Sequence, residues 1–196
     1  MSTAFAPGKC ILFGEHAVVY GHPAVAVSID SGVEITIEES EDWEINNQYN
    51  TDGYEKFNPK KHPHIQHIIR NLFNYEGKPL RINVQSNLFS GAGLGSSAAL
   101  SNAMGAALHQ FTKPGKEIDL IKLSKIGHSA EAATQEGRAS PTDSAASSLG
   151  GCVVVSGERI DTLEHVFDTS LVTPEGKRSW SIHHAELHEN INQSWL

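Results

Sequence analysis

Glycines and serines at positions 91–97 form the segment of this chain that is best suited to hold an anion. Gly91, Gly93 and Gly95 stand at alternate positions in the run GAGLGSSAA, and an alanine-rich stretch follows. Glycine lets the backbone adopt positive φ and approach a ligand closely. The first N–H groups of a helix have no internal partner, so together with the helix dipole they favour a negative charge. The pattern predicts a phosphate-binding loop formed by Gly91, Ala92, Gly93, Leu94, Gly95, Ser96 and Ser97.

This loop differs from the common nucleotide-binding motifs. It is not a P-loop, because no Gly-Lys-Ser/Thr follows, and its spacing is not the Gly-x-Gly-x-x-Gly of dinucleotide-binding proteins. A nucleotide bound here must therefore meet a lysine from elsewhere in the chain. A tight connection between a strand and a helix would have a similar composition, and that plain structural interpretation stays open.

Five other side chains have the chemistry that phosphoryl transfer needs, although each has an ordinary structural explanation by itself. Lys9 could be a solvated charge at a strand edge, and Glu15 with His16 could form a polar turn. Glu131 could be a generic helical acid, and Asp143, which follows Ser-Pro-Thr, a turn or capping residue. Phosphoryl transfer requires an anion cradle, oxygen ligands for Mg²⁺, a cation and a group that orients the nucleophile. The occurrence of all these residues beside the glycine loop favours that chemistry.

Two groups of closely spaced histidines have spacings that zinc sites use. The first group lies on an amphipathic helix, and neither group has a cysteine or a clear carboxylate set beside it. We therefore favour surface histidines over a metal cluster at both places. The groups are His62, His64 and His67, and His183, His184 and His188.

The elements that would position these residues can be predicted from hydrophobic periodicity. Apolar positions recur at helical spacing over 62–73, where Pro63 suits a first turn and Ile65, Ile68, Ile69 and Phe73 share one face. Further helices are expected at 98–111 and 118–135, a turn at 140–146, and a polar loop over 39–61. Expected strands are a buried one at 10–13 after a turn, two at 25–29 and 33–38 joined by a turn at 30–32, and others at 80–89 and 150–155.

Composition narrows the class of protein. The 196 residues carry a formal net charge of −8, which argues against nucleic acid or an anionic membrane as a partner. The two cysteines, Cys10 and Cys152, fit neither a disulfide framework nor a metal site. No signal peptide or membrane-spanning run is recognisable. These observations predict a soluble, cytoplasmic protein.

Three segments together resemble the GHMP small-molecule kinases. They are PGKCILFGEHAVVYG at 7–21, GAGLGSSAA at 91–99 and EGRASPTDSAASSLGG at 136–151. The resemblance covers residues 4–155. It implies an α+β fold with a mixed β-sheet, helices on one face and a left-handed β-α-β unit. GEHAVVYG and ASPTD further resemble the members of the family that phosphorylate mevalonate with ATP.

The resemblance also implies a role for each matching residue. The loop from Gly91 to Ser97 would wrap the triphosphate of ATP, with Ser97 and Glu131 as ligands of Mg²⁺. Asp143 would orient or deprotonate the substrate hydroxyl, and Lys9 would lower the pKa of that hydroxyl and stabilise developing charge. Contacts to mevalonate would come from Glu15, His16 and Ser140.

Nothing after Gly151 matches the second glycine-rich segment of this family. We therefore expect residues 1–156 to form the N-terminal ATP- and substrate-binding domain and 157–196 to begin a truncated C-terminal domain. The apolar faces left open predict association with a second copy or with a complementing C-terminal fragment. The alternatives are a catalytically silent nucleotide-binding remnant and a related kinase acting on phosphomevalonate, homoserine or a sugar.

Overall fold

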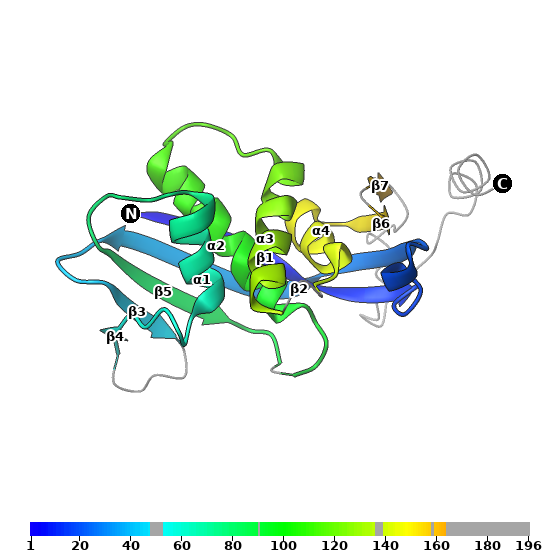
Figure 1. Ribbon diagram of the computed structural model, residues 1–196, viewed down its shortest axis with the longest axis horizontal. Helices are drawn as coiled ribbons and strands as arrows, with labels where there is room; N and C mark the ends of the chain where they lie inside the picture. The colour runs from blue at the N-terminus through cyan, green and yellow to red at the C-terminus, as the bar shows by residue number, and fades with distance from the viewer. Residues whose placement is uncertain (48–52, 90, 136–138, 158, 164–196) are drawn as a thin grey trace, which may run out of the picture.

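A computed structural model describes residues 1–47, 53–89, 91–135, 139–157 and 159–163. Strands and helices in these residues build an α+β fold with one mixed sheet (Figure 1). The strands are β1 Ser2–Phe13, β2 Ala24–Glu39, β3 Glu44–Asn47, β4 Glu55–Lys56, β5 Leu80–Ser86, β6 Cys152–Ser156 and β7 Arg159–Leu163. The α-helices are α1 Pro63–His67, α2 Ser96–Thr112, α3 Leu120–Thr134 and α4 Pro141–Leu149, with a 3₁₀ turn at Val18–Tyr20 and a π-helical turn at Ile68–Leu72.

The sheet is organised around β2. Its strand order is β4-β3-β5-β2-β6-β7, and β1 pairs with β2 over nearly the full length of both strands. The pair β3–β5 is parallel and every other pair in the described residues is antiparallel, so the predicted mixed sheet is confirmed. The chain passes through α1 between β3 and β5, which makes a β-α-β unit. Its left-handed sense stays a prediction.

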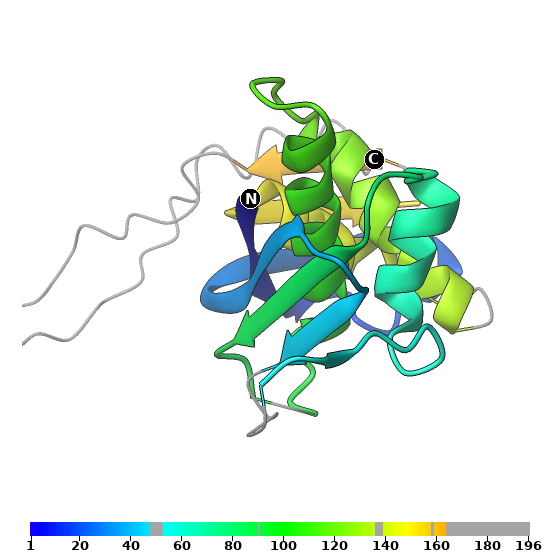
Figure 2. The same cartoon turned by 90° about the vertical axis from the view of Figure 1, so that its left-hand side faces the viewer.

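Helices cover one face of this sheet, as expected (Figures 1 and 2). Helix α2 packs directly on β1 and β2, and α3 packs on α2 and α4. Buried alanines on α2 let the helix approach the strands closely, and larger apolar side chains from the strands fill the layer between them. This core includes Ala99, Ala103, Ala107, Met104, Leu108, Ile35, Ile37 and Ile82.

Strand β2 is continuous through the turn expected at 30–32. Gly32 lies opposite Pro7 of β1, and the register between the two strands shifts just after that pair. The side chain of Asn87 accepts a hydrogen bond from the Gly32 N–H at 2.7 Å, and the Asn87 N–H donates to the Gly32 carbonyl. The prediction of two strands was wrong because this partner, distant in sequence, satisfies the backbone that a turn would otherwise have satisfied.

Strand β1 also differs from its prediction. It begins at Ser2 with no preceding turn, and its buried residues are Ala6, Gly8 and Lys9. Cys10 and Phe13 are exposed although the run 10–13 is apolar, because this end of the strand extends past the helices (Figure 1). The expectation of a buried strand at 10–13 was therefore wrong.

The predicted helices are confirmed at 98–111 and 118–135, within a few residues of α2 and α3. The helix predicted at 62–73 is confirmed as α1 followed by the π-helical turn, with Ile65, Ile68 and Ile69 buried. The turn predicted at 140–146 was wrong, because these residues begin α4. The loop predicted at 39–61 contains β3 and β4.

The proposed boundary at 156/157 stays a prediction. Strand β7 continues the sheet to Leu163, and residues 164–196 lie outside the described part of the chain. In the residues that the structure describes, no helix is both long enough and apolar enough to cross a membrane.

Gly32→Ala should lower the free energy of unfolding by about 1–3 kcal/mol. A Cβ at this position would lie 2.3 Å from the Ala6 carbonyl oxygen and 2.5 Å from the Phe5 ring, so the strands would have to move apart. Chemical denaturation measures the effect. Glu34→Ala, at an exposed position of the same strand, is the control and should change stability by about 0.5 kcal/mol or less. Equal stabilities of Gly32→Ala and the parent would contradict this close approach.

Candidate functional site

The glycine loop delivers the chain to the N-terminus of α2. Gly91, Gly93 and Gly95 all have positive φ, near 70°, and Gly95 is the residue that precedes the first helical turn. No side chain caps this helix, whereas Asp119 caps α3 and Ser140 caps α4. The first N–H groups of α2 therefore lack a side-chain acceptor, which suits a site for an external anion.

Lys9 connects β1 to this loop. Its backbone N–H donates to the Leu94 carbonyl at 2.9 Å, and its side chain passes over Gly95. A Cβ on Gly95 would lie 2.8 Å from Cγ of Lys9, so glycine at this position provides both the positive φ and the space for the lysine. Lys9 is only 6% exposed. The interpretation of Lys9 as a solvated strand-edge charge is therefore wrong.

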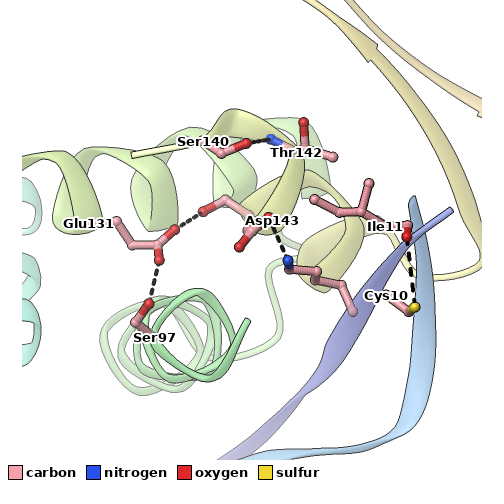
Figure 3. Close-up of polar contacts among 9 residues, drawn as sticks. Cys10, Ile11, Ser97, Glu131, Ser140, Thr142 and Asp143 are labelled. Atoms are coloured by element: carbon pink, nitrogen blue, oxygen red, sulfur yellow. Dashed lines mark hydrogen bonds and ion pairs between the residues drawn. The ribbon is translucent and has the colours of Figure 1, made fainter. Parts of the chain in front are cut away.

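Lys9 forms an ion pair with Asp143. Its Nζ lies 3.2 Å from Oδ1 of Asp143, which belongs to the first turn of α4 (Figure 3). Burial raises the pKa of the Asp143 carboxyl, the Lys9 ammonium opposes that rise, and the Glu15 carboxylate adds to it. The turn begins at Ser140, whose hydroxyl accepts a hydrogen bond from the Thr142 N–H at 3.3 Å. This cap holds the start of the helix that carries Asp143.

Glu131 lies on α3 and is 3% exposed. Its Oε1 accepts a hydrogen bond of 2.5 Å from the Ser97 hydroxyl (Figure 3). Its Oε2 accepts one of 3.0 Å from the Ser144 hydroxyl. Burial raises the pKa of Glu131, and the two serine hydrogen bonds oppose that rise. Asp143 raises the pKa of Glu131 further and Lys9 lowers it, so these charges act on one another.

Four elements thus bring four of the expected site residues together. Lys9 comes from β1, Ser97 from α2, Glu131 from α3 and Asp143 from α4. The result is a cation beside one carboxylate, and a hydroxyl beside another, at the uncapped start of a helix. Such an arrangement can bind a phosphate-bearing ligand, take up a proton on a carboxylate and stabilise negative charge with the ammonium.

Two other expected residues lie in the turn after β1. Glu15 and His16 are both exposed, and among the described residues no hydrogen bond or ion pair attaches either of them to the cluster. Glu15 is nevertheless close enough for its charge to act on Asp143. Their expected contact with a substrate stays a prediction.

The first histidine group makes no metal site. The described residues contain no group of three or more metal-ligating side chains. His64 instead shares a hydrogen bond of 2.9 Å with Thr134, and His62 stacks on Phe57. The second group, at 183–188, lies outside the described residues.

Sequence reasoning misses Ser144, which holds Glu131, because the pattern of residues 140–146 predicts a turn. The signal was present, since a serine followed directly by proline is a common helix start, with the serine as cap and the proline in the first turn. A helix from Pro141 would have placed Asp143 and Ser144 in its first turn.

The sequence of the chain is similar to a known family of proteins. Residues 63–151 match the family model of the GHMP kinases N terminal domain. A mevalonate kinase of Methanothermobacter thermautotrophicus is 38% identical over 159 residues, which cover 81% of this chain and 51% of that protein. A mevalonate kinase of Archaeoglobus fulgidus is 34% identical over 76% of this chain and 50% of that protein.

Solved structures agree with the sequence comparison. The crystal structure of the Methanococcus jannaschii mevalonate kinase matches with a TM-score of 0.72 at 28% identity, over 84% of this chain and 56% of that one. The chain spans about half the length of the curated relatives that it matches. From the fold, the family match and these similarities together, we conclude that the chain carries a GHMP kinase N-terminal domain and is related to archaeal mevalonate kinases.

Proposed function

We propose that the chain binds ATP at the loop 91–97 and takes part in transferring the γ-phosphoryl group to a hydroxyl of mevalonate, giving 5-phosphomevalonate. One observation carries the proposal. The ion pair between the buried Lys9 and the partly exposed Asp143 lies against a glycine loop whose following helix has no side-chain cap. A buried ion pair is a poor source of stability, so its position beside an anion site favours a chemical role.

The two charged residues divide the work on the acceptor alcohol. An alcohol is a weak nucleophile at neutral pH and gains reactivity when a carboxylate accepts its proton. Burial raises the pKa of Asp143, which makes it a stronger base than an exposed aspartate. Lys9 keeps that carboxylate ionised and offers a positive charge to the oxygen that loses its proton. Its place 3.2 Å from Asp143 lets one hydroxyl reach both groups.

Ser97 and Glu131 have the chemistry to hold Mg²⁺. Magnesium prefers oxygen ligands and is commonly bound through one or two carboxylates together with the phosphates of a nucleotide. A partly buried hydroxyl and a buried carboxylate, in hydrogen-bond contact near the start of α2, provide the protein part of such a ligand set. When bound there, the ion would neutralise charge on the phosphate oxygens. Burial also raises the pKa of Glu131, so the carboxyl is costly to ionise until a cation arrives.

Mevalonate is proposed as the acceptor because the similar archaeal proteins are named mevalonate kinases. Glu15, His16 and Ser140 are proposed to contact it. Glu15 acts on Asp143 through its charge, and Ser140 begins the helix that carries Asp143, so both lie on the Asp143 side of the site. An assay of ADP release with mevalonate, phosphomevalonate, homoserine and galactose as acceptors tests the assignment. ATP binding without turnover of any acceptor would favour a nucleotide-binding role.

Mg·ATP should raise the melting temperature of the chain, and Ser97→Ala should weaken this effect. A ligand present at about 100 times its Kd stabilises by about 2.7 kcal/mol, which corresponds to several degrees for a chain of this size. Differential scanning fluorimetry with and without Mg²⁺ measures the shift. Ser148→Ala, which removes a hydroxyl that bonds the Leu120 carbonyl and no site residue, is the control and should keep the full shift. No shift in the parent would contradict the proposed phosphate site.

Asp143→Asn should reduce phosphoryl transfer by about 10²–10⁴-fold while ATP binding survives, because the amide cannot accept the proton. Steady-state ADP release and calorimetric titration with Mg·ATP separate the two effects. Equal turnover by the variant and the parent would exclude Asp143 from the chemistry.

Glu131→Gln should raise the melting temperature of the ligand-free chain at about pH 8 and make it less dependent on pH. The pKa of Glu131 is raised above its ordinary 4.5, so just above pH 4.5 the folded chain keeps a proton that the unfolded chain releases. The contribution of this group to stability therefore falls as the pH rises from 4.5 through the folded value. Glutamine avoids that loss but should also abolish stabilisation by Mg·ATP. Glu117→Gln, at an exposed site, is the control that should reproduce neither change.

A further inference from the structure

Asn102 is a fully buried polar residue among the helices that carry the site. It lies on α2, five residues after Ser97, and is 0% exposed. Its Nδ2 donates a hydrogen bond of 2.9 Å to the backbone carbonyl of Ser144 on α4. This bond joins two helices through residues that are 42 positions apart in the sequence.

The orientation of the Asn102 amide follows from its neighbours. A backbone carbonyl can only accept, so Nδ2 must be the atom that faces Ser144. Oδ1 then points toward Gly127 of α3 and has no hydrogen-bond partner among the described residues. A Cβ at position 127 would lie 2.3 Å from that oxygen, so only glycine leaves room for the amide.

Ser144 transmits this contact to the site. Its carbonyl accepts from Asn102, its hydroxyl donates to Glu131, and the preceding residue is Asp143, the partner of Lys9. One residue of α4 therefore contacts α2 through its backbone and α3 through its side chain. Any shift of α4 relative to α2 would move the Glu131 and Asp143 contacts together.

Stability alone does not account for an amide at this place. An apolar side chain of similar size would fill the same space and would leave no buried Oδ1 unpaired. The amide instead fixes the position of α4 relative to α2, because its hydrogen bond requires a specific distance and direction.

We propose that Asn102 is a positioning residue, and that its amide, seated against Gly127, sets the place of α4 so that Ser144 holds Glu131 and Asp143 meets Lys9. The importance of that placement for catalysis rests on the proposed function. The placement itself does not, and it can be measured in the ligand-free chain.

The test compares Asn102→Leu, Asn102→Ala, Gly127→Ala and the double variant Asn102→Ala/Gly127→Ala with the parent. Amide resonances of Asp143 and Ser144 in ¹⁵N-resolved NMR spectra report the position of α4, and calorimetry gives the Kd for Mg·ATP. Ile35→Val is the matched control, because it weakens the core on β2 without touching this contact. It should lower the melting temperature but leave both readouts unchanged.

Asn102→Leu should keep most of the melting temperature, shift the Asp143 and Ser144 resonances and weaken Mg·ATP binding about tenfold, as loss of a residue that supports a metal ligand does. Gly127→Ala should reproduce the shifts by pushing the amide away. The double variant should be no worse than Asn102→Ala, because the oxygen that the new methyl group would hit is gone.

Unchanged α4 resonances in Asn102→Leu would overturn the proposal, as would additive effects in the double variant. If Asn102→Ala does not fold, Gly127→Ala and Asn102→Leu decide the question by the same readouts. A parent that fails to bind Mg·ATP would refute the proposed function, while the resonance shifts would still decide the role of Asn102.

Discussion

The ion pair between Lys9 and Asp143 is the interaction on which the arrangement of the site depends. Both groups lie largely out of solvent, and burial of the carboxyl raises its pKa. Charges in such places are tolerated only when they are paired, and removal of one partner leaves the other uncompensated. Strand β1 and helix α4 must therefore keep a fixed position relative to one another. The glycine loop must also leave space between them for the lysine side chain.

The glycine loop contacts Lys9 of this ion pair directly. The Leu94 carbonyl accepts a hydrogen bond from the backbone N–H of Lys9, and Gly95, which has no side chain, leaves space for the lysine side chain. Phosphates bound by the N–H groups of 91–97 would thus lie next to a cation whose position the same loop defines. In the proposed function, nucleotide binding and placement of the lysine would both follow from this one local structure, which suits a reaction that depends on positioning and charge stabilisation.

Stability and chemistry are separated within the fold. The larger apolar core lies between the sheet and helices α1 and α2, where isoleucines, leucine and methionine are fully buried. Beside α4 the apolar cluster is small and rests on Ala145, Ala146 and valines of β6. Several buried residues of α3 and α4 are instead polar, among them Ser144, Ser147 and Glu131. Small side chains bring the helices close, and polar contacts then decide how those helices are aligned.

The sequence by itself determined the class of the chain and most of its elements, because both depend on local signals. An alanine-rich, helix-compatible stretch identified α2, helical periodicity identified α1, and alternation identified β5. The motifs around Lys9, the glycine loop and Asp143 indicated the GHMP kinases. Only the tertiary structure decided that Lys9 is buried, that β2 runs unbroken past Gly32 and that Ser144 and Asn102 support the site. Each of these depends on a partner distant in the sequence: Lys9 on Asp143, Gly32 on Asn87, Ser144 on Glu131, and Asn102 on Ser144. Periodicity within a short window carries no information about such partners.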